Sequence, residues 1–188
     1  MKKIMIVILL LAMSPLLTAR EGKFFAGIGA AALFPGDGRF KELYGNVQVS
    51  PELTAGYHLY RNFYFWLGGS FISASGVIPL LEEKIQATQT FISLGAGWET
   101  RRGRRLQADL GAALLLAGFR EKAMGSTASK WAPGFDARAG LRYFLREKLF
   151  LAVSLGYAGA WTTTRTEAGT VDIILGGMRL GGQLGLRF

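Results

Sequence analysis

The feature that most constrains the fold is an alternation of apolar with polar or small residues, which returns in eight segments of the sequence. In residues 47–60, every second position from Val47 to Leu59 is apolar, and the positions between them are polar, small or amphipathic. A period of two is typical of a β-strand whose two faces meet different surroundings. The segments are residues 24–34, 47–60, 63–72, 91–99, 106–116, 131–143, 149–161 and 174–188. The sequence therefore predicts an all-β chain with an even number of strands.

The charged residues within these segments share one face, and the opposite face carries no charge. A soluble β-fold would also alternate, but here the apolar stripes begin or end in aromatic residues. Two such residues ten positions apart, Phe24 and Phe34, span roughly 33 Å along a strand, or about 25 Å after a tilt near 40°. That span matches the apolar band of a membrane barrel between its two aromatic girdles. We expect an eight-stranded antiparallel up-and-down transmembrane β-barrel with its polar face inside.

The first nineteen residues have the composition of a secretory signal peptide. Lys2 and Lys3 form a positive start, residues 4–13 are an unbroken apolar stretch, and Ala19 is a small residue suited to cleavage. The stretch is short for a membrane-spanning helix, although an N-terminal anchor is the alternative interpretation. We therefore predict a signal peptide over residues 1–19 and a barrel domain over residues 20–188.

The connections between the segments alternate between short and long. The expected short connections are residues 61–62, 101–104 and 146–148, and the expected long ones are residues 35–46, 76–87, 120–130 and 163–170. In outer-membrane barrels short turns face the periplasm and long loops face outward. The pattern predicts that both termini lie in the periplasm.

The composition excludes several classes of function. The formal net charge of +9 favours an anionic partner, but a secreted chain without a basic helix or an RNA-binding aromatic motif is not expected to bind nucleic acid. The absence of Cys excludes thiol catalysis, zinc-thiolate sites and disulfides. No phosphate-binding loop or metal-ligand spacing is present, so no cofactor is expected. Arginines such as Arg101, Arg102 and Arg104 lie in a short turn, where they would face anionic lipid headgroups.

Together, the signal peptide, the eight alternating segments and the final Leu186-Arg187-Phe188 resemble the small outer-membrane β-barrels of the OmpA and OmpX type. The resemblance covers residues 20–188. It implies a cell-envelope protein of the bacterial outer membrane, with outer-membrane lipids as partners, and we expect a monomer. It also implies that Leu186 and Phe188 form the signal read by the outer-membrane assembly machinery. The extracellular partner is left undefined.

The inward face is rich in glycine, which is expected to make room for bulky inward side chains such as Tyr60, Tyr64 and Trp66. It also carries charges of both signs, which can pair and so offset their desolvation. The expected interior network consists of Glu52, Asp109, Asp136, Arg138, Arg142 and Arg179. A packed interior of this kind favours a structural or surface-interaction role, and a narrow porin-like channel is the alternative.

Catalysis is not expected. The single histidine, His58, falls on the inward face near a short turn and has no Ser within two residues of it, and no G-x-S-x-G motif is present. A lone interior histidine is more often a hydrogen-bonded structural group than a catalytic base. A lipid-modifying barrel enzyme is therefore the least favoured hypothesis.

One predicted loop is unusually apolar. Within residues 76–87 it contains Val77, Ile78, Leu80 and Leu81. An apolar loop of this kind packs on its neighbours or on the lipid rim, or it binds a small hydrophobic ligand. The second alternative function is therefore a binder or transporter of small hydrophobic ligands.

Overall fold

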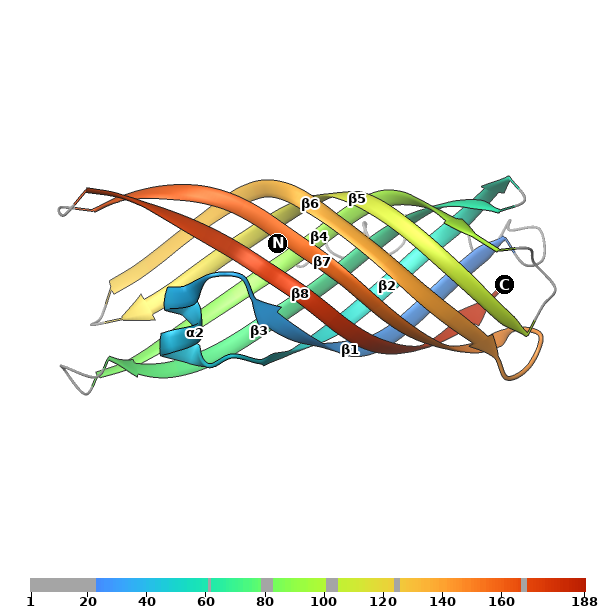
Figure 1. Cartoon of the computed structure of the whole chain (residues 1–188), viewed down its shortest axis with the longest axis horizontal. Helices are drawn as coiled ribbons and strands as arrows, with labels where there is room; N and C mark the ends of the chain where they lie inside the picture. The colour runs from blue at the N-terminus through green and yellow to red at the C-terminus, as the bar shows by residue number, and fades with distance from the viewer. Residues whose placement is uncertain (1–22, 61, 79–82, 101–104, 124–125, 167–168) are drawn as a thin grey trace, which may run out of the picture.

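In the computed structural model of the chain, eight antiparallel strands close into a barrel, and a short helix lies at one end (Figure 1). The structure describes residues 23–60, 62–78, 83–100, 105–123, 126–166 and 169–188, so the predicted signal peptide lies outside the described residues. Each strand pairs with the next, and β8 pairs with β1, which confirms the predicted antiparallel barrel. The elements are β1 (Phe24–Pro35), α2 (Gly38–Tyr44), β2 (Gln48–Tyr60), β3 (Phe63–Ile78), β4 (Glu83–Glu99), β5 (Leu106–Ala123), β6 (Ser126–Phe144), β7 (Leu149–Thr166) and β8 (Gly169–Arg187). No helix among the described residues is long and apolar enough to cross a membrane.

The two ends of the barrel differ (Figure 1). Phe24, Phe188 and the C-terminal ends of β2, β4 and β6 lie at one end, which we call the termini end. The helix α2 and the C-terminal ends of β3, β5 and β7 lie at the other, which we call the helix end.

The predicted division into two faces is confirmed by the burial of the side chains. Tyr64, Phe91 and Asp136 point into the barrel and are buried, whereas Leu53 and Leu114 lie on the outer wall, with Leu114 78% exposed. A wall on which every strand exposes large apolar side chains is suited to lipid rather than to water.

Tyr60 is an exception, because the prediction that it points inward is wrong. Its side chain is 65% exposed. The register between β2 and β3 shifts between His58 and Tyr60. Such a bulge places one extra residue in the strand and reverses the facing of the residues beyond it.

Three of the predicted long loops are largely strand. The β3–β4 pairing continues to Ile78↔Glu83, and the β5–β6 pairing continues to Ala123↔Ser126. The β7–β8 pairing likewise reaches Thr166↔Gly169. These segments lack a continuous apolar face, so the alternation fades although the backbone ladder persists. Their backbone groups still need partners, and the ladder supplies them.

The fourth predicted loop contains α2. Asp37 caps the helix, since its Oδ1 accepts a hydrogen bond from the Phe40 amide at 3.1 Å. Phe40 and Tyr44, four residues apart, share one face of the helix. They are buried with Ala74, Ile85 and Ala87 of β3 and β4, so α2 rests against the inner wall at the helix end.

The wall divides near the helix end between β6 and β7. Within the described residues their pairing runs from Phe144↔Phe150 to Gly134↔Ala160 and then stops, although both strands continue. Beyond that point the β5–β6 and β7–β8 hairpins form separate arms (Figure 1). Lys130 donates a hydrogen bond from Nζ to the Thr163 carbonyl across the gap.

Candidate functional site

The termini end of the interior is packed with aromatic side chains. Phe25, Tyr64, Trp66, Phe144 and Phe150 form a buried cluster, which we call the aromatic layer. Glycines make room for it, as the sequence predicted: a Cβ at Gly97 would lie 2.3 Å from the Tyr64 ring, and a Cβ at Gly185 would lie 2.2 Å from the Phe150 ring. A larger residue at either position would displace a ring from the layer.

The helix end of the interior is filled by a second cluster, the apolar layer. Its members are buried aliphatic and aromatic side chains from seven strands. They are Leu33, Ile72, Phe91, Leu115, Ala117, Ala132, Ala158, Ala160 and Leu175. The polar residues in the middle of the interior are therefore flanked by one apolar cluster toward each end.

Between the two layers, Arg179 joins two of the carboxylates that the sequence assigned to the interior. Its Nη2 lies 2.6 Å from Asp136 Oδ1, and its Nη1 lies 3.4 Å from Glu52 Oε1. Ser93 donates a hydrogen bond to Asp136 at 2.7 Å, and the Gln183 amide donates one to Glu52 at 3.3 Å. We call Glu52, Asp136, Arg179 and Gln183 the central polar cluster.

Asp109 and Arg142, two further predicted residues, lie together nearer the termini end. Arg142 Nε is 3.5 Å from Asp109 Oδ1. The Tyr64 hydroxyl donates a hydrogen bond to the other Asp109 oxygen at 3.0 Å. Both charged side chains are buried, so each depends on these partners for the solvation it has lost.

A cluster around Glu99 escaped the sequence analysis. Glu99 is 0% exposed. Its carboxylate lies 2.9 Å from His58 Nε2, 3.0 Å from Arg142 Nη1 and 3.2 Å from Arg187 Nη2. The alternation places Glu99, His58 and Arg187 on the inward face, but only the strand register brings the four side chains together. We call these four residues the Glu99 cluster.

Arg138 differs from the other predicted arginines, because no carboxylate of the described residues lies within ion-pair distance of it. Its guanidinium carbon sits 3.7 Å from the centroid of the Trp66 ring, as in a cation–π contact. Two voids of about 30 and 20 Å³ border it. Since one water needs roughly 10–15 Å³ of such space, they hold only a few waters.

His58 is part of this buried structure. Its Nδ1 lies 3.1 Å from the Lys23 carbonyl, and its ring packs against Phe25 and Tyr64. Across the described residues, no group of three or more His, Asp or Glu side chains is placed to hold a metal ion.

A separate pocket of about 410 Å³ lies at the helix end, between α2 and the two hairpin arms. Phe40, Phe119 and Ile173 contribute apolar surface to it. The Tyr44 hydroxyl donates a hydrogen bond to Glu121 at 3.0 Å beside it. Burial, followed by this hydrogen bond and the negative charge of Glu121, raises the pKa of Tyr44 above its ordinary value. We call this space the helix-end pocket.

The apolar residues predicted to form a loop lie elsewhere. Val77 and Ile78 belong to β3, and the Val77 side chain is 50% exposed. Leu80 and Leu81 lie outside the described residues. The helix-end pocket draws its described lining from other segments.

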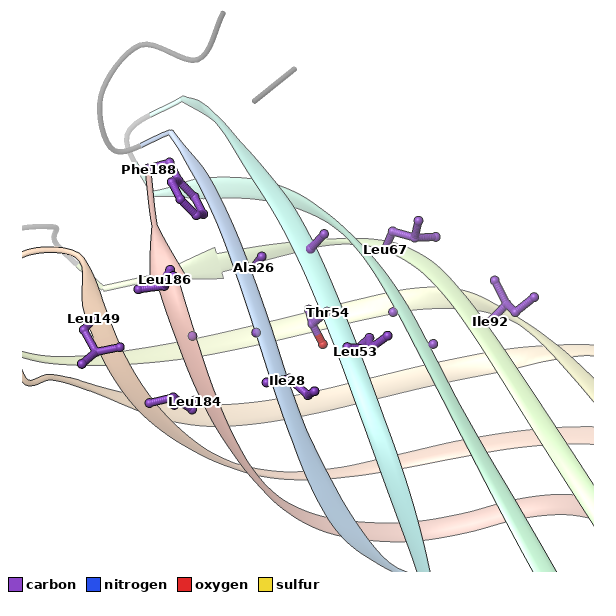
Figure 2. Close-up of a pocket in the computed structure, with 15 residues that line it drawn as sticks. Ala26, Ile28, Leu53, Thr54, Leu67, Ile92, Leu149, Leu184, Leu186 and Phe188 are labelled. Carbon is purple, nitrogen blue, oxygen red and sulfur yellow. The ribbon is translucent and has the colours of Figure 1, made fainter. Parts of the chain in front are cut away.

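A groove of about 670 Å³ runs over the outer wall near the termini end (Figure 2). It is lined by residues of β1, β2 and β3, by Ile92 of β4, and by residues from the ends of β7 and β8. Leu186 and Phe188, the predicted assembly signal, are among them (Figure 2). Both project from the outer wall rather than into the interior.

The closed eight-stranded barrel with a filled interior is the fold of small outer-membrane barrels. At 15% identity the chain is similar to the crystal structure of Neisserial surface protein A, with a TM-score of 0.66 over 88% of this chain and 97% of that one. It is also similar to OprG from Pseudomonas aeruginosa, at 15% identity and a TM-score of 0.69 over 90% and 97% of the two chains.

Ail, the attachment invasion locus protein of Yersinia pestis, is a third similar structure, at 15% identity and a TM-score of 0.54 over 88% of this chain and 99% of that one. The sequence matches no protein-family model and no curated protein. At the level of architecture, the structural likenesses confirm the predicted resemblance to small outer-membrane barrels.

Proposed function

We propose that this chain is an integral protein of the bacterial outer membrane with a structural or surface-interaction role, and that its interior is a plug rather than a pore. The observation that carries the proposal is that the large side chains of the aromatic layer and of the apolar layer fill the interior on either side of the central polar cluster. The proposal includes removal of residues 1–19 as a signal peptide, a barrel domain over residues 20–188, and termini in the periplasm.

The balance of charge in the interior supports a structural role. The central polar cluster, the Asp109–Arg142 pair, the Glu99 cluster and Arg138 together contain four carboxylates and four guanidinium groups. An ion that crossed this region would have to displace ion pairs whose side chains are at most 12% exposed. Buried pairs of this kind are costly to break, because each partner would be left without compensation.

The same packing argues against catalysis. His58 is 1% exposed and lies beneath aromatic rings, with Glu99 and the Lys23 carbonyl as polar neighbours. A general base has to reach the proton that it abstracts from a substrate. We therefore propose that His58 has a structural role and that the protein is not an enzyme.

Conductance of the folded protein in a planar bilayer tests the plug. Folding is first shown by heat-modifiable migration on a gel. We expect the wild type to show no channel openings. The double variant Trp66→Ala with Phe91→Ala should show channel openings, because it removes one large side chain from each layer. Discrete openings of the wild type, with an ion selectivity that changes in Arg138→Ala, would show that the interior conducts.

The helix-end pocket favours a second candidate function, the binding of small hydrophobic ligands. A binding pocket is typically a concave and mostly apolar space of a few hundred cubic ångströms. We expect a lipophilic fluorescent dye to bind the folded protein, and Ile173→Asp to abolish binding. Val77→Asp is the matched control, since Val77 is an exposed apolar residue at the same end outside the pocket lining. Loss of binding in Val77→Asp alone would instead assign the dye to the tip of β3, and equal binding in all three proteins would contradict both sites.

A further inference from the structure

The outer wall has a depression whose floor consists of two alanines. Ala26 of β1 and Ala55 of β2 are directly paired. Leu186 of β8 pairs with Ala26 on one side, and Leu67 of β3 pairs with Ala55 on the other. Two small side chains between two leucines leave a notch two strands wide. This notch forms part of the 670 Å³ groove, and we call it the alanine groove.

Larger side chains border the alanine groove along the strands. On the termini side, the exposed residues Tyr57 and Phe65 are paired in the next row of the outer wall. Phe24, which is paired with Tyr57, is buried, and the Phe188 ring lies 6.0 Å from its ring. On the opposite side, Ile28 is paired with both Leu53 and Leu184. Figure 2 shows Phe188 near the ends of the strands and Leu184, Ile28 and Leu53 farther along the wall. The depression is therefore bordered by an aromatic row toward the end of the barrel.

Basic residues lie just beyond this aromatic row. Lys23 directly precedes Phe24, and Arg146 and Lys148 belong to the turn between β6 and β7. The turn is held against β8, because the Arg187 amide donates a hydrogen bond to the Lys148 carbonyl at 2.7 Å. The strand after the turn begins with Leu149, which pairs with Leu186 at the side of the groove. Glu147 is the acidic residue of the turn, so the rim carries a net positive charge.

We propose that the alanine groove is a binding site for one anionic phospholipid. An acyl chain occupies the groove, and the phosphate faces Lys23, Arg146 and Lys148. The proposal rests on the proposed function, which places this wall in lipid. Aromatic residues mark the level of the headgroups in membrane barrels, so a chain that enters past the aromatic row meets the alanine floor at acyl depth. Basic side chains at the same rim attract an anionic headgroup.

Native mass spectrometry of the folded full-length chain in detergent, titrated with phosphatidylglycerol or phosphatidylcholine, tests the site. We expect one phosphatidylglycerol to bind more tightly than phosphatidylcholine. Ala26→Leu with Ala55→Leu fills the floor, so the affinity for phosphatidylglycerol should fall by on the order of tenfold. Ala112→Leu with Ala137→Leu is the matched control, since these exposed alanines are also paired on the outer wall but lie outside the groove.

The charges are tested separately. The double variant Arg146→Gln with Lys148→Gln should lower the affinity for phosphatidylglycerol by on the order of tenfold and leave the affinity for phosphatidylcholine unchanged. The double variant Arg39→Gln with Arg120→Gln, at the helix end, should change the affinity for neither lipid. Glycerophosphoglycerol, which has the headgroup without chains, should not compete; competition at equal concentration would show an anion site without an acyl groove.

Several results would overturn the lipid site. One is equal affinity for the two lipids, and another is an equal loss of phosphatidylglycerol affinity in the floor variant and its control. A third is a dimer that disappears when the floor is filled, which would assign the groove to a second copy of the chain. Heat-modifiable migration and insertion into vesicles are measured on the same samples. A protein that inserts and folds but shows no lipid preference would overturn the site and leave the membrane barrel intact, whereas failure to insert would overturn the proposed function.

Discussion

Replacing the buried carboxylate of the Glu99 cluster gives the sharpest test of the interior. Glu99→Gln keeps the volume of the side chain and removes its negative charge. The amide that replaces one oxygen is a hydrogen-bond donor, and where it faces the Arg142 guanidinium at 3.0 Å or the Arg187 guanidinium at 3.2 Å it meets a group that is itself a donor.

The expected loss depends on the partners that remain. Removing one member of a buried ion pair typically costs about 3–5 kcal/mol, because the other charge is left uncompensated. Arg142 keeps Asp109 at 3.5 Å, and Arg187 keeps a hydrogen bond to Gln107 at 3.0 Å. Since both arginines retain a partner, we expect the lower part of that range, about 3 kcal/mol of the free energy of unfolding.

The measurement is urea unfolding of the protein folded in lipid vesicles, followed by tryptophan fluorescence and by gel migration. The change in stability is read from the unfolding midpoint at constant slope. Glu147→Gln is the matched control, because this glutamate lies exposed in a turn at the same end of the barrel. It should unfold as the wild type does, since exposed charges contribute little.

A shift of less than about 0.5 kcal/mol for Glu99→Gln, the range typical of surface substitutions, would refute the reasoning. It would mean that water reaches the cluster and solvates the cations when the carboxylate is removed. A shift in the slope rather than the midpoint would indicate a change in the compactness of one of the two states.

Two further predictions concern the outer wall and α2. Leu114→Arg places a charge on the lipid-facing wall and should destabilise the barrel by roughly 2–4 kcal/mol in vesicle unfolding; no effect on folding into lipid would contradict the assigned facing. Tyr44→Phe should remove one strongly alkaline step from the ultraviolet titration of the tyrosines, because the pKa of Tyr44 is raised. The neutral phenol stabilises the docked helix below the ordinary tyrosine pKa of about 10, and this contribution is lost as the pH rises through the raised value.

The alternation was sufficient to predict the barrel and the facing of most side chains. It works because a strand between lipid and a packed interior must keep its two faces chemically different. The same rule failed where that contrast ends. Tyr60 follows a bulge, and the strand ends near Ile78 and Thr166 lie beyond the region of regular alternation.

The sequence contains a local signal for the helix α2, which the alternation of apolar and polar residues does not show. Asp37 before Phe40 and Tyr44 is a capping residue followed by an apolar pair at helical spacing. Its seven residues are too few for helical periodicity to stand out, and most of its stability comes from packing against β3 and β4. The Glu99 cluster is similar, because its members come from four strands and only the register of a closed barrel brings them together.

The order of the interior clusters explains how so many charges can be buried in one small barrel. From the helix end inward, the apolar layer separates the central polar cluster from the helix end, and the aromatic layer packs around the Asp109–Arg142 pair toward the termini end. Low access of water strengthens each ion pair, but it also makes any unpaired charge costly. Arg138 satisfies this constraint without a carboxylate, since it lies over Trp66 beside voids that hold only a few waters. Opening a path for ions would therefore require both layers and the Trp66 contact to move together, which is why we expect the wild-type barrel to remain closed.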